Sequence, residues 1–206
     1  MSKQYSNFLF NTIAPIYGLF YRKQKKRYRE VIERASSVLS LASYRSILDV
    51  GCGTGALCSV LHEMGLDVTG VDPAQNMLHA AKRQPENTSI NFLQANVLDG
   101  LPFDDQSFDV SIASYVAHGM PQQERARLYA EMRRVTKSKV IIYDYNQNRA
   151  TLTTIVEWLE RGDYFRFIKH PSEEMRDCVH EMKACFQDVQ VLDIDTHASW
   201  YICTPG

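Results

Sequence analysis

Three glycines and two carboxylates within a short stretch are the residues whose types and spacing best suit chemistry. The segment Leu48–Gly55 has the sequence Leu-Asp-Val-Gly-Cys-Gly-Thr-Gly and lies between a predicted strand and a predicted helix. Glycines in such a turn let the backbone approach a ligand closely, and the helix N-terminus offers N–H groups and a positive dipole end. Asp72 ends the next predicted strand, where its carboxylate can accept hydrogen bonds from both hydroxyls of a ribose. The combination predicts a binding site for an adenosine-containing cofactor.

The spacing of the glycines indicates which cofactor this is. Dinucleotide-binding turns have the pattern G-x-G-x-x-G, whereas this turn has the shorter G-x-G-x-G, with Asp49 two residues before the first glycine. A carboxylate there would repel a pyrophosphate but would attract an ammonium group. S-adenosylmethionine carries an ammonium group, a carboxylate, a sulfonium and a ribose, and no phosphate. The sequence therefore favours S-adenosylmethionine, and an NAD-dependent oxidoreductase is the weaker alternative.

Short apolar runs alternate with helical patterns along most of the chain. Strands are predicted at 46–50, 67–71, 90–93, 108–113 and 139–144, and helices at 55–64, 74–83 and 122–135. Strands that alternate with such helices predict a parallel sheet with helices on both faces. Further along, helices are predicted near 153–161 and 172–185, and strands at 189–192 and 199–203. The link between these last strands is too short for a helical crossover, so they should pair antiparallel as a hairpin at the sheet edge.

The composition of the 206-residue chain is that of an ordinary globular protein. It is 45% hydrophobic and 23% charged, and its formal net charge of −1 offers no overall attraction to nucleic acid. The lack of a long apolar run and of a signal peptide favours a cytoplasmic protein. The five cysteines form no CxxC pair and are odd in number, so we expect buried thiols and neither disulfides nor a metal site. We expect a single domain over residues 1–206.

The motifs resemble those of class I S-adenosylmethionine-dependent methyltransferases over roughly residues 40–145. Asp49–Gly55 is similar to the family's first motif, and Asp72 matches its ribose-binding acid. The resemblance implies a doubly wound α/β fold with a mostly parallel seven-stranded sheet and an antiparallel last strand. It divides the chain into a helical N-terminal lid (1–40), a cofactor-binding core (41–145) and acceptor-side helices with the C-terminal hairpin (146–206).

The resemblance also implies a set of cofactor-binding residues. They are Asp49, Gly51, Gly53, Gly55 and Ser114 for the methionine part, Asp72 for the ribose, Met77, Asn96 and Val97 for the adenine, and Tyr17 as a lid residue, with Cys52 and Pro73 as further cofactor-binding residues. Asn96 departs from the family, which usually has an acidic residue at that place. Its side-chain oxygen can still accept a hydrogen bond from the adenine amino group.

Methyl transfer makes modest demands on the protein. The reaction is an in-line displacement whose leaving group departs neutral, so alignment of the reactants and exclusion of water supply most of the catalysis. A base is needed only where the acceptor must lose a proton. His118, just past the fourth predicted strand, is the candidate base, with a structural or substrate-positioning role as the alternative. Tyr143, Asp144 and Tyr145 end the fifth predicted strand and could equally face the acceptor or be strand-end residues bonded to the backbone. A later group is more typical of core packing, with an acceptor pocket as the alternative: Trp158, Tyr164, Phe165, Phe167 and His170.

Motifs that the sequence lacks reduce the number of acceptor classes. The family's base-amino methyltransferases place an Asn/Asp-Pro-Pro-aromatic motif after the fourth strand, where this chain has Ser114–Ala117. This difference argues against DNA as the acceptor. The metal-dependent catechol methyltransferases need clustered carboxylates, and we identify no such cluster in the sequence, so we expect no metal. We expect a small-molecule acceptor, while RNA, the accepting atom and the oligomeric state stay open. A protein that binds S-adenosylmethionine without turnover is the alternative, because methyl transfer requires no obligatory catalytic residue.

The stretch Arg22–Arg34 has an uneven charge. It contains seven basic and two acidic residues, which gives a local net charge of +5. An apolar helical face lies mostly opposite the basic side chains and consists of Tyr28, Val31, Ile32, Ala35 and Val38. We expect a helix packed on the domain with a solvated basic face. Weak association with a membrane surface or an acidic partner is the alternative.

Overall fold

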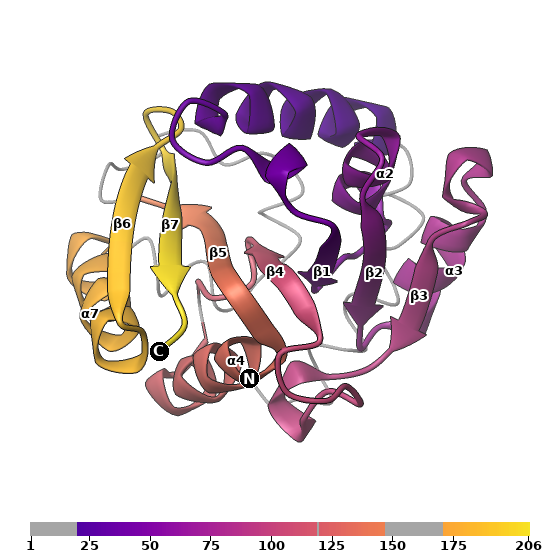
Figure 1. Cartoon of the computed structure of the whole chain (residues 1–206). Coiled ribbons are helices and arrows are strands. Elements are labelled where there is room, and N and C mark those ends of the chain that lie inside the picture. Colours follow the sequence, from indigo (N-terminus) through magenta and orange to yellow (C-terminus); the bar gives the residue numbers. More distant parts are fainter. Residues whose placement is uncertain (1–19, 119, 147–170) are drawn as a thin grey trace.

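A computed structural model describes residues 20–118, 120–146 and 171–206, and its centre is a seven-stranded sheet (Figure 1). The strands are β1 (Ser46–Val50), β2 (Asp67–Asp72), β3 (Asn91–Gln94), β4 (Phe108–Ser114), β5 (Thr136–Tyr145), β6 (Asp188–Asp193) and β7 (Ala198–Thr204). Their order is β3-β2-β1-β4-β5-β7-β6, with β1 to β5 parallel and β7 antiparallel to both β5 and β6. The predicted doubly wound sheet and the predicted edge hairpin are both confirmed.

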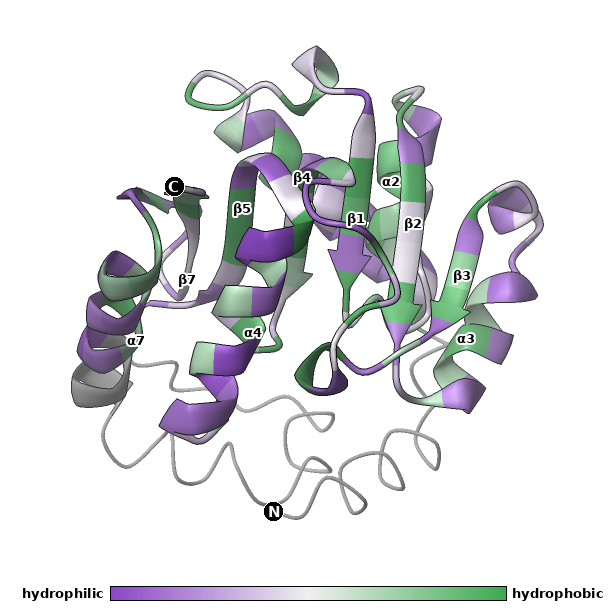
Figure 2. Cartoon of the chain, turned by 60° about the horizontal axis from the view of Figure 1, so that its bottom comes forward, coloured by the Kyte–Doolittle hydropathy of each residue, from purple (hydrophilic) through white to green (hydrophobic). Residues whose placement is uncertain are grey.

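Helices cover both faces of the sheet. They are helix 20–35, α2 (Ala56–Glu63), α3 (Gln75–Lys82), α4 (Gln122–Val135) and α7 (Pro171–Cys185), with the short 3-10 helices η1 (Leu41–Ser43), η2 (Pro85–Asn87) and η3 (Val97–Asp99). Ile47 of β1 is buried together with apolar residues of helix 20–35, α2 and α3, whereas Leu48 and Val50 are buried together with those of α4 and α7. Because successive strand residues point to opposite faces, a strand covered on both sides is apolar at nearly every position. Figure 2 shows this contrast between the largely hydrophobic central strands and the mixed surfaces of α4 and α7.

Strand β5 begins three residues earlier than the sequence predicts. Thr136 follows α4 directly, and its hydroxyl donates to the carbonyl of Met132 at 2.6 Å and lies 2.7 Å from Oγ of Ser111. The start of β5 is polar, so a prediction based on apolar runs does not include it. The predicted helix at 153–161 lies outside the described residues.

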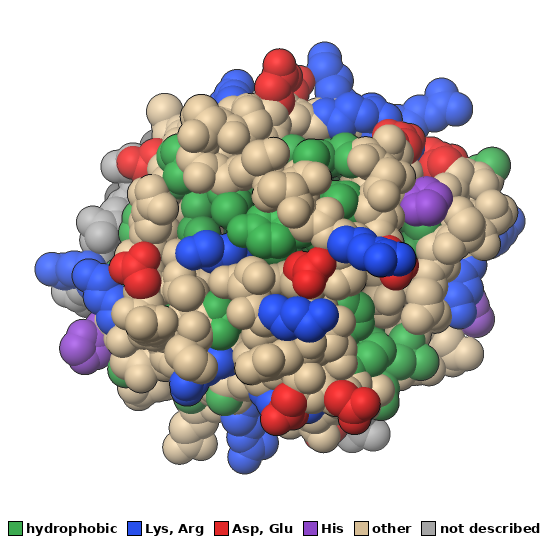
Figure 3. All heavy atoms as spheres, in the orientation of Figure 1, with side chains coloured by type: hydrophobic (Ala, Val, Ile, Leu, Met, Phe, Trp, Pro, Cys, Tyr) green, Lys and Arg blue, Asp and Glu red, His purple; other side chains and the backbone are tan. Residues whose placement is uncertain are grey.

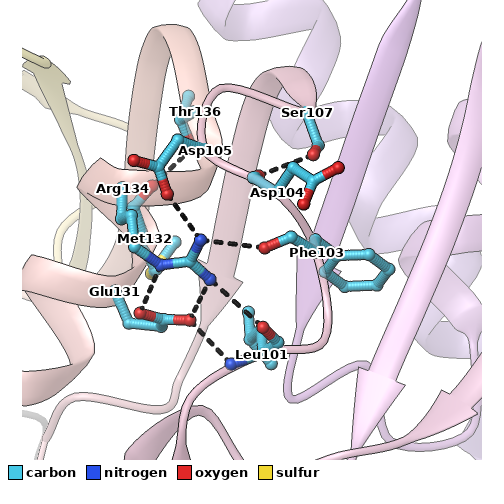
Figure 4. A network of polar contacts seen from close by, with 9 residues as sticks. All are labelled: Leu101, Phe103, Asp104, Asp105, Ser107, Glu131, Met132, Arg134 and Thr136. Atoms are coloured by element: carbon cyan, nitrogen blue, oxygen red, sulfur yellow. Dashed lines mark hydrogen bonds and ion pairs between the residues drawn. The ribbon is translucent and has the colours of Figure 1, made fainter.

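Arg134 at the end of α4 holds the loop that precedes β4 (Figure 4). Its guanidinium donates to the carbonyls of Leu101 and Phe103 at 3.1 and 2.8 Å, and to Oδ1 of Asp105 at 2.8 Å. Glu131 receives two further bonds from Arg134 and one from the backbone N–H of Leu101. The five donors of a guanidinium have a fixed geometry that suits such a task. The network fixes the chain at the entry to β4, the strand whose other end leads to His118.

Helix 20–35 packs its apolar face on the sheet, with one exception to the predicted set. Val31, Ile32 and Ala35 are buried in the core, and Tyr28 packs against it. Val38 is exposed, because the helix ends at residue 35 and the chain turns there. Within the described ranges, no helix is long and apolar enough to cross a membrane.

The expectation of a solvated basic face on this helix is wrong at Lys25. Lys25 is buried, with its Nζ 2.7 Å from Oε1 of Glu63 on α2 and 2.9 Å from Oε1 of Glu86 on η2. Arg27 pairs with Asp195 in the link between β6 and β7. Figure 3 shows acidic side chains among the basic ones along the top of the molecule, where this helix lies. Ion pairs therefore attach the helix to the domain.

Candidate cofactor and acceptor site

The glycine turn lies between the end of β1 and the start of α2. Gly51 has a φ of +73°, which side chains rarely tolerate, and a Cβ there would come within 2.6 Å of Cγ2 of Val116. The N–H groups of Gly51 and Cys52 donate to the carbonyl of Val71 at 2.8 and 3.0 Å. Gly55 is the N-cap of α2. The turn is thereby tied to β2 and packs directly against the loop that follows β4.

Asp72 at the end of β2 is bonded to the same turn. Its Oδ2 accepts the backbone N–H of Gly53 at 2.9 Å, and its Oδ1 accepts that of Ala74 at 2.8 Å. Burial raises the pKa of Asp72 to about 6, while these two backbone hydrogen bonds oppose the shift. The structure thus brings together the two features that the sequence placed 19 residues apart. Each carboxylate oxygen keeps a lone pair with which it can accept a ribose hydroxyl.

Asp49 of β1 is a buried carboxyl beside the turn. Its Oδ2 accepts a hydrogen bond from Sγ of Cys58 at 3.1 Å, and only 2% of the residue is exposed. Burial raises the pKa of Asp49 to about 7; the bond from Cys58 opposes the shift and the charge of Asp72 adds to it. A neighbouring cation stabilises the charged form of such a carboxyl. The residues present therefore fit the ammonium or sulfonium group of S-adenosylmethionine and do not fit a pyrophosphate.

The residues expected to bind adenine lie after β2 and β3. Met77 on α3 and Val97 on η3 are buried, and Pro73, a further expected cofactor-binding residue directly after β2, is half-buried. Asn96 is the N-cap of η3, with Oδ1 accepting the backbone N–H of Leu98 at 3.0 Å. This local bond occupies one lone pair of the amide oxygen and leaves the other for a ligand. Asn96 therefore has a local structural role that the sequence analysis did not predict.

Sequence analysis missed one polar group that helix 20–35 contributes beside the turn. Burial and the charge of Asp49 raise the pKa of Tyr28, and the nearby Ser114 hydroxyl opposes that shift. Tyr28 thus lies near the ends of both β1 and β4, although we had assigned it only to an apolar face. A tyrosine at an inward helix position was the available signal, since a buried phenol usually has a polar partner. The expected lid residue Tyr17 lies outside the described residues.

His118 and Asp144 meet at the carboxyl ends of β4 and β5. Nδ1 of His118 lies 2.9 Å from Oδ1 of Asp144, and Oδ2 of Asp144 accepts the backbone N–H groups of Ala117 and His118 at 3.1 and 3.0 Å. Asp144 is 1% exposed. The parallel register that pairs Ser114 with Tyr143 places the loop after β4 beside Asp144. Sequence analysis named both residues for the acceptor side without pairing them.

Tyrosine rings surround this histidine. The ring of Tyr115, which has a φ of +57°, lies 4.8 Å from that of Tyr143 and 5.2 Å from that of Tyr145. The His118 ring lies 4.9 Å from that of Tyr145. The other aromatic candidates and His170, which lie at 158–170, are outside the described residues.

The chain is similar in sequence to known methyltransferases. Residues 47–139 match a family model described as a methyltransferase domain. A ubiquinone biosynthesis O-methyltransferase of Coxiella burnetii is 32% identical over 139 residues, which covers 63% of this chain and 59% of that protein. A ubiquinone/menaquinone biosynthesis C-methyltransferase of Campylobacter jejuni is 28% identical over 130 residues, which covers 57% of this chain and 54% of that protein. The chain thus matches little more than half the length of these two relatives.

Solved structures of methyltransferases share the fold. An S-adenosylmethionine-dependent methyltransferase from Aquifex aeolicus has a TM-score of 0.65 at 16% identity, with 90% of this chain and 98% of that chain covered. Human N-acetylserotonin methyltransferase in complex with S-adenosylmethionine has a TM-score of 0.66 at 15% identity, with 96% of this chain and 59% of that chain covered. The sequence match spans the glycine turn and Asp72, and the sheet order agrees with the shared fold. Residues 47–139 are therefore similar to a methyltransferase domain, and the chain shares the fold of solved methyltransferases.

Proposed function

We propose that the protein transfers a methyl group from S-adenosylmethionine to a small-molecule acceptor. The observation that carries the proposal is the bond between the glycine turn and Asp72, beside the buried carboxyl of Asp49. In this arrangement the carboxylate of Asp72 can accept hydrogen bonds from a ribose, and the carboxyl of Asp49 can bind a cationic group. Both lie at the carboxyl ends of parallel strands, where such sheets bind ligands.

In this proposal, different parts of the site bind the two ends of the cofactor. The methionine part is bound by Asp49, Gly51, Cys52, Gly53, Gly55 and Ser114, the ribose by Asp72 and Pro73, and the adenine by Met77, Asn96 and Val97. The buried side chains of Met77 and Val97 suit the apolar faces of a planar ring. Burial raises the pKa of Cys52 to about 11, so its side chain acts there as a neutral thiol.

A small molecule is the acceptor class that the relatives support. The names of the Coxiella and Campylobacter relatives both refer to quinone biosynthesis. The overall charge of −1 gives no electrostatic preference for a nucleic acid.

Calorimetric titration with S-adenosylmethionine, S-adenosylhomocysteine and NAD tests the cofactor. We expect the first two to bind with micromolar affinity and NAD not to bind. A screen with S-adenosylmethionine labelled in its methyl group then tests turnover. Binding of NAD alone would contradict the proposal, and binding of S-adenosylmethionine without transfer to any acceptor would identify a binding protein in place of an enzyme.

A further inference from the structure

Three buried polar atoms lie in one row across the ends of β4 and β5 and the first half of β7. The register pairs Ser114 with Tyr143 and Tyr143 with Trp200, so these side chains point to the same face of the sheet. Within the part of the chain that the structure describes, Oγ of Ser114, the hydroxyl of Tyr143 and Nε1 of Trp200 have no hydrogen-bond partner. Most buried polar groups in proteins are paired, so a row of unpaired ones indicates a surface for a polar ligand.

Helix 20–35 covers this face of the sheet. Tyr143 and Trp200 are buried together with apolar residues of that helix, and the ring of Tyr28 lies 6.4 Å from that of Tyr143. Ser114, at one end of the row, is a residue that we assign to the methionine part of the cofactor. The row therefore begins beside the part of the cofactor that carries the methyl group and continues toward β7.

Tyr115 connects the row to the surface of the protein. Its φ of +57° is rare for a residue with a side chain, and its N–H donates to the carbonyl of Tyr143 at 2.8 Å. The two rings lie 4.8 Å apart, and Tyr115 is 37% exposed whereas Tyr143 is 1% exposed. Burial raises the pKa of Tyr115, and the neighbouring Tyr143 adds to the shift. Tyr115 is therefore a neutral hydroxyl that can donate a hydrogen bond to a ligand.

Arg27 of helix 20–35 brings a cation to these tyrosines. It pairs with Asp195 in the link between β6 and β7, and the N–H of Asn146, directly after β5, donates to a carbonyl of the same link at 2.9 Å. These contacts place Arg27 at the carboxyl end of β5. Burial lowers the pKa of Arg27, but the neighbouring Tyr143 and Tyr115 lead the opposing influences, and the net shift is upward.

The carboxylates near Arg27 engage only part of its guanidinium. Asp195 contacts Nη2, and Oε2 of Glu30 lies 4.0 Å from Nη1, which is too far for a hydrogen bond. Oδ1 of Asp195 accepts the backbone N–H groups of His197 and Ala198 at 2.6 and 2.9 Å, so the link also stabilises its charge. A guanidinium has five N–H donors, and the Arg27 side chain is 36% exposed. It can therefore bind a further acceptor group.

We propose that the methyl acceptor carries a carboxylate, which is bound by Arg27 and the hydroxyls of Tyr115 and Tyr143. The inference rests on the proposed function and assigns a substrate class and a specificity-determining residue, Arg27, to the same site. The carboxylate anchors the molecule and is not the group that receives the methyl. The rest of the acceptor extends along the row toward Ser114 and the methionine part of the cofactor.

A planar group with a single negative charge fits these residues better than other ligands. A carboxylate accepts two parallel hydrogen bonds from a guanidinium and keeps lone pairs for the two phenols. A phosphate dianion would bring twice the charge close to Asp195 and Glu30, which would repel it. A cationic ligand would be repelled by Arg27, and a neutral carbonyl would gain hydrogen bonds without the attraction between charges.

Benzoate is the probe that tests the inference, and benzamide, which has a similar shape and no charge, is its control. Ligand-detected NMR titration measures the binding of each to the full chain saturated with S-adenosylhomocysteine. The variants are Arg27→Met and Tyr143→Phe. Arg22→Met removes the same charge at an exposed position of the same helix and is the matched control. Urea unfolding and titration with S-adenosylhomocysteine check the stability and cofactor affinity of each variant.

We expect benzoate to bind with millimolar or higher affinity, and benzamide at least about tenfold more weakly. Arg27→Met should weaken benzoate binding at least about tenfold, and Arg22→Met should leave it unchanged. Tyr143→Phe should weaken benzoate binding without lowering stability, because it removes a buried hydroxyl that has no partner among the described residues. A merely structural role of either residue would change stability and leave the preference for benzoate over benzamide as it is. If Arg27→Met does not fold, Tyr143→Phe decides.

Acceptors found in the screen with labelled S-adenosylmethionine give a second test. Each carboxylic acid should have a kcat/KM at least about tenfold above that of its amide, and Arg27→Met should remove the difference. The inference is overturned if the protein binds S-adenosylhomocysteine but binds benzoate no better than benzamide, or if Arg27→Met binds benzoate as the unmodified protein does. Methyl transfer to neutral or cationic acceptors alone also overturns it. Failure to bind S-adenosylmethionine and S-adenosylhomocysteine overturns the proposed function itself, and the inference with it.

Discussion

The backbone N–H of Gly53 donates to Oδ2 of Asp72 at 2.9 Å, so the glycine turn and the end of β2 are held as one unit. The second oxygen of Asp72 accepts the N–H of Ala74 at the start of the chain segment leading to α3. One carboxylate therefore shapes the backbone on both sides of the end of β2, where we propose that the ribose binds.

Asp72→Ala should weaken binding of S-adenosylmethionine at least tenfold, which is about 1.4 kcal/mol. The variant loses the ribose acceptor and frees the N–H groups of Gly53 and Ala74. Calorimetric titration measures the effect, and Asp67→Ala serves as the control because Asp67 is exposed at the opposite end of the same strand. Equal dissociation constants for Asp72→Ala and the unmodified protein would remove Asp72 from the site.

Cofactor affinity should rise with pH between about 6 and 8. The pKa of Asp49 is raised to about 7 and that of Asp72 to about 6, so both carboxyls are partly protonated in mild acid. We expect the cationic groups of the cofactor to bind the ionised form of Asp49. Binding should therefore release a proton at low pH, and the release should disappear at higher pH, where Asp49 is ionised before the cofactor binds. Titration calorimetry in buffers of different ionisation enthalpy measures the proton release. Asp49→Asn should weaken binding and reduce the release; release that is the same in both proteins would contradict the role given to Asp49.

Gly51→Ala should destabilise the protein more than Gly65→Ala. Both positions have a positive φ, which costs a side chain about 1 kcal/mol or more, but a Cβ at Gly65 meets open space whereas one at Gly51 meets Val116 at 2.6 Å. We expect the contact at Gly51 to add a further loss of about 1–3 kcal/mol. Urea unfolding of the two variants measures the difference. Equal losses would mean that Val116 moves aside without cost.

Arg134→Met should loosen the loop that precedes β4. The substitution leaves the carbonyl of Phe103 without its guanidinium donor, and the carbonyl of Leu101 keeps only the N–H of Phe103, with an expected loss of about 1–3 kcal/mol. Hydrogen exchange should become faster between β3 and β4, as measured by mass spectrometry. Arg127→Met, at an exposed position of the same helix, should leave the exchange there unchanged. Equal exchange in the two variants would show that the loop is held without Arg134.

Lys25→Met should reduce the protection of helix 20–35 against hydrogen exchange. Glu63 and Glu86 would lose their shared cation, with an expected loss of more than about 1 kcal/mol, because Lys25 is buried while the two carboxylates are partly exposed. Lys26→Met removes the same charge at an exposed neighbouring position and is the control. Unchanged protection in Lys25→Met would mean that apolar packing alone holds the helix.

The sequence predicted the sheet well because its signals are local. An apolar run followed by glycine or aspartate marks the end of a buried strand, and the short link before Ala198 already required a hairpin. The start of β5 was missed because Thr136 is held by side-chain hydrogen bonds and not by apolar burial.

The site was predictable only where the chemistry lies in one motif. Gly53 and Asp72 carry their own pattern, whereas the contact between His118 and Asp144 depends on the register between β4 and β5. Lys25 is buried against carboxylates from two other elements. Helical periodicity alone cannot predict these partners, so it placed Lys25 on the solvated face.

Strand β6 is the last strand of the sheet order, and it carries Asp188 and Asp193 at its two ends. The outer edge of a sheet is a template on which another chain can add a strand, and Val191 in the middle of β6 is 48% exposed. If two copies met edge to edge and antiparallel, Asp188 of each would face Asp193 of the other. The repulsion at both ends would oppose such pairing, so these two aspartates disfavour edge-to-edge association through β6.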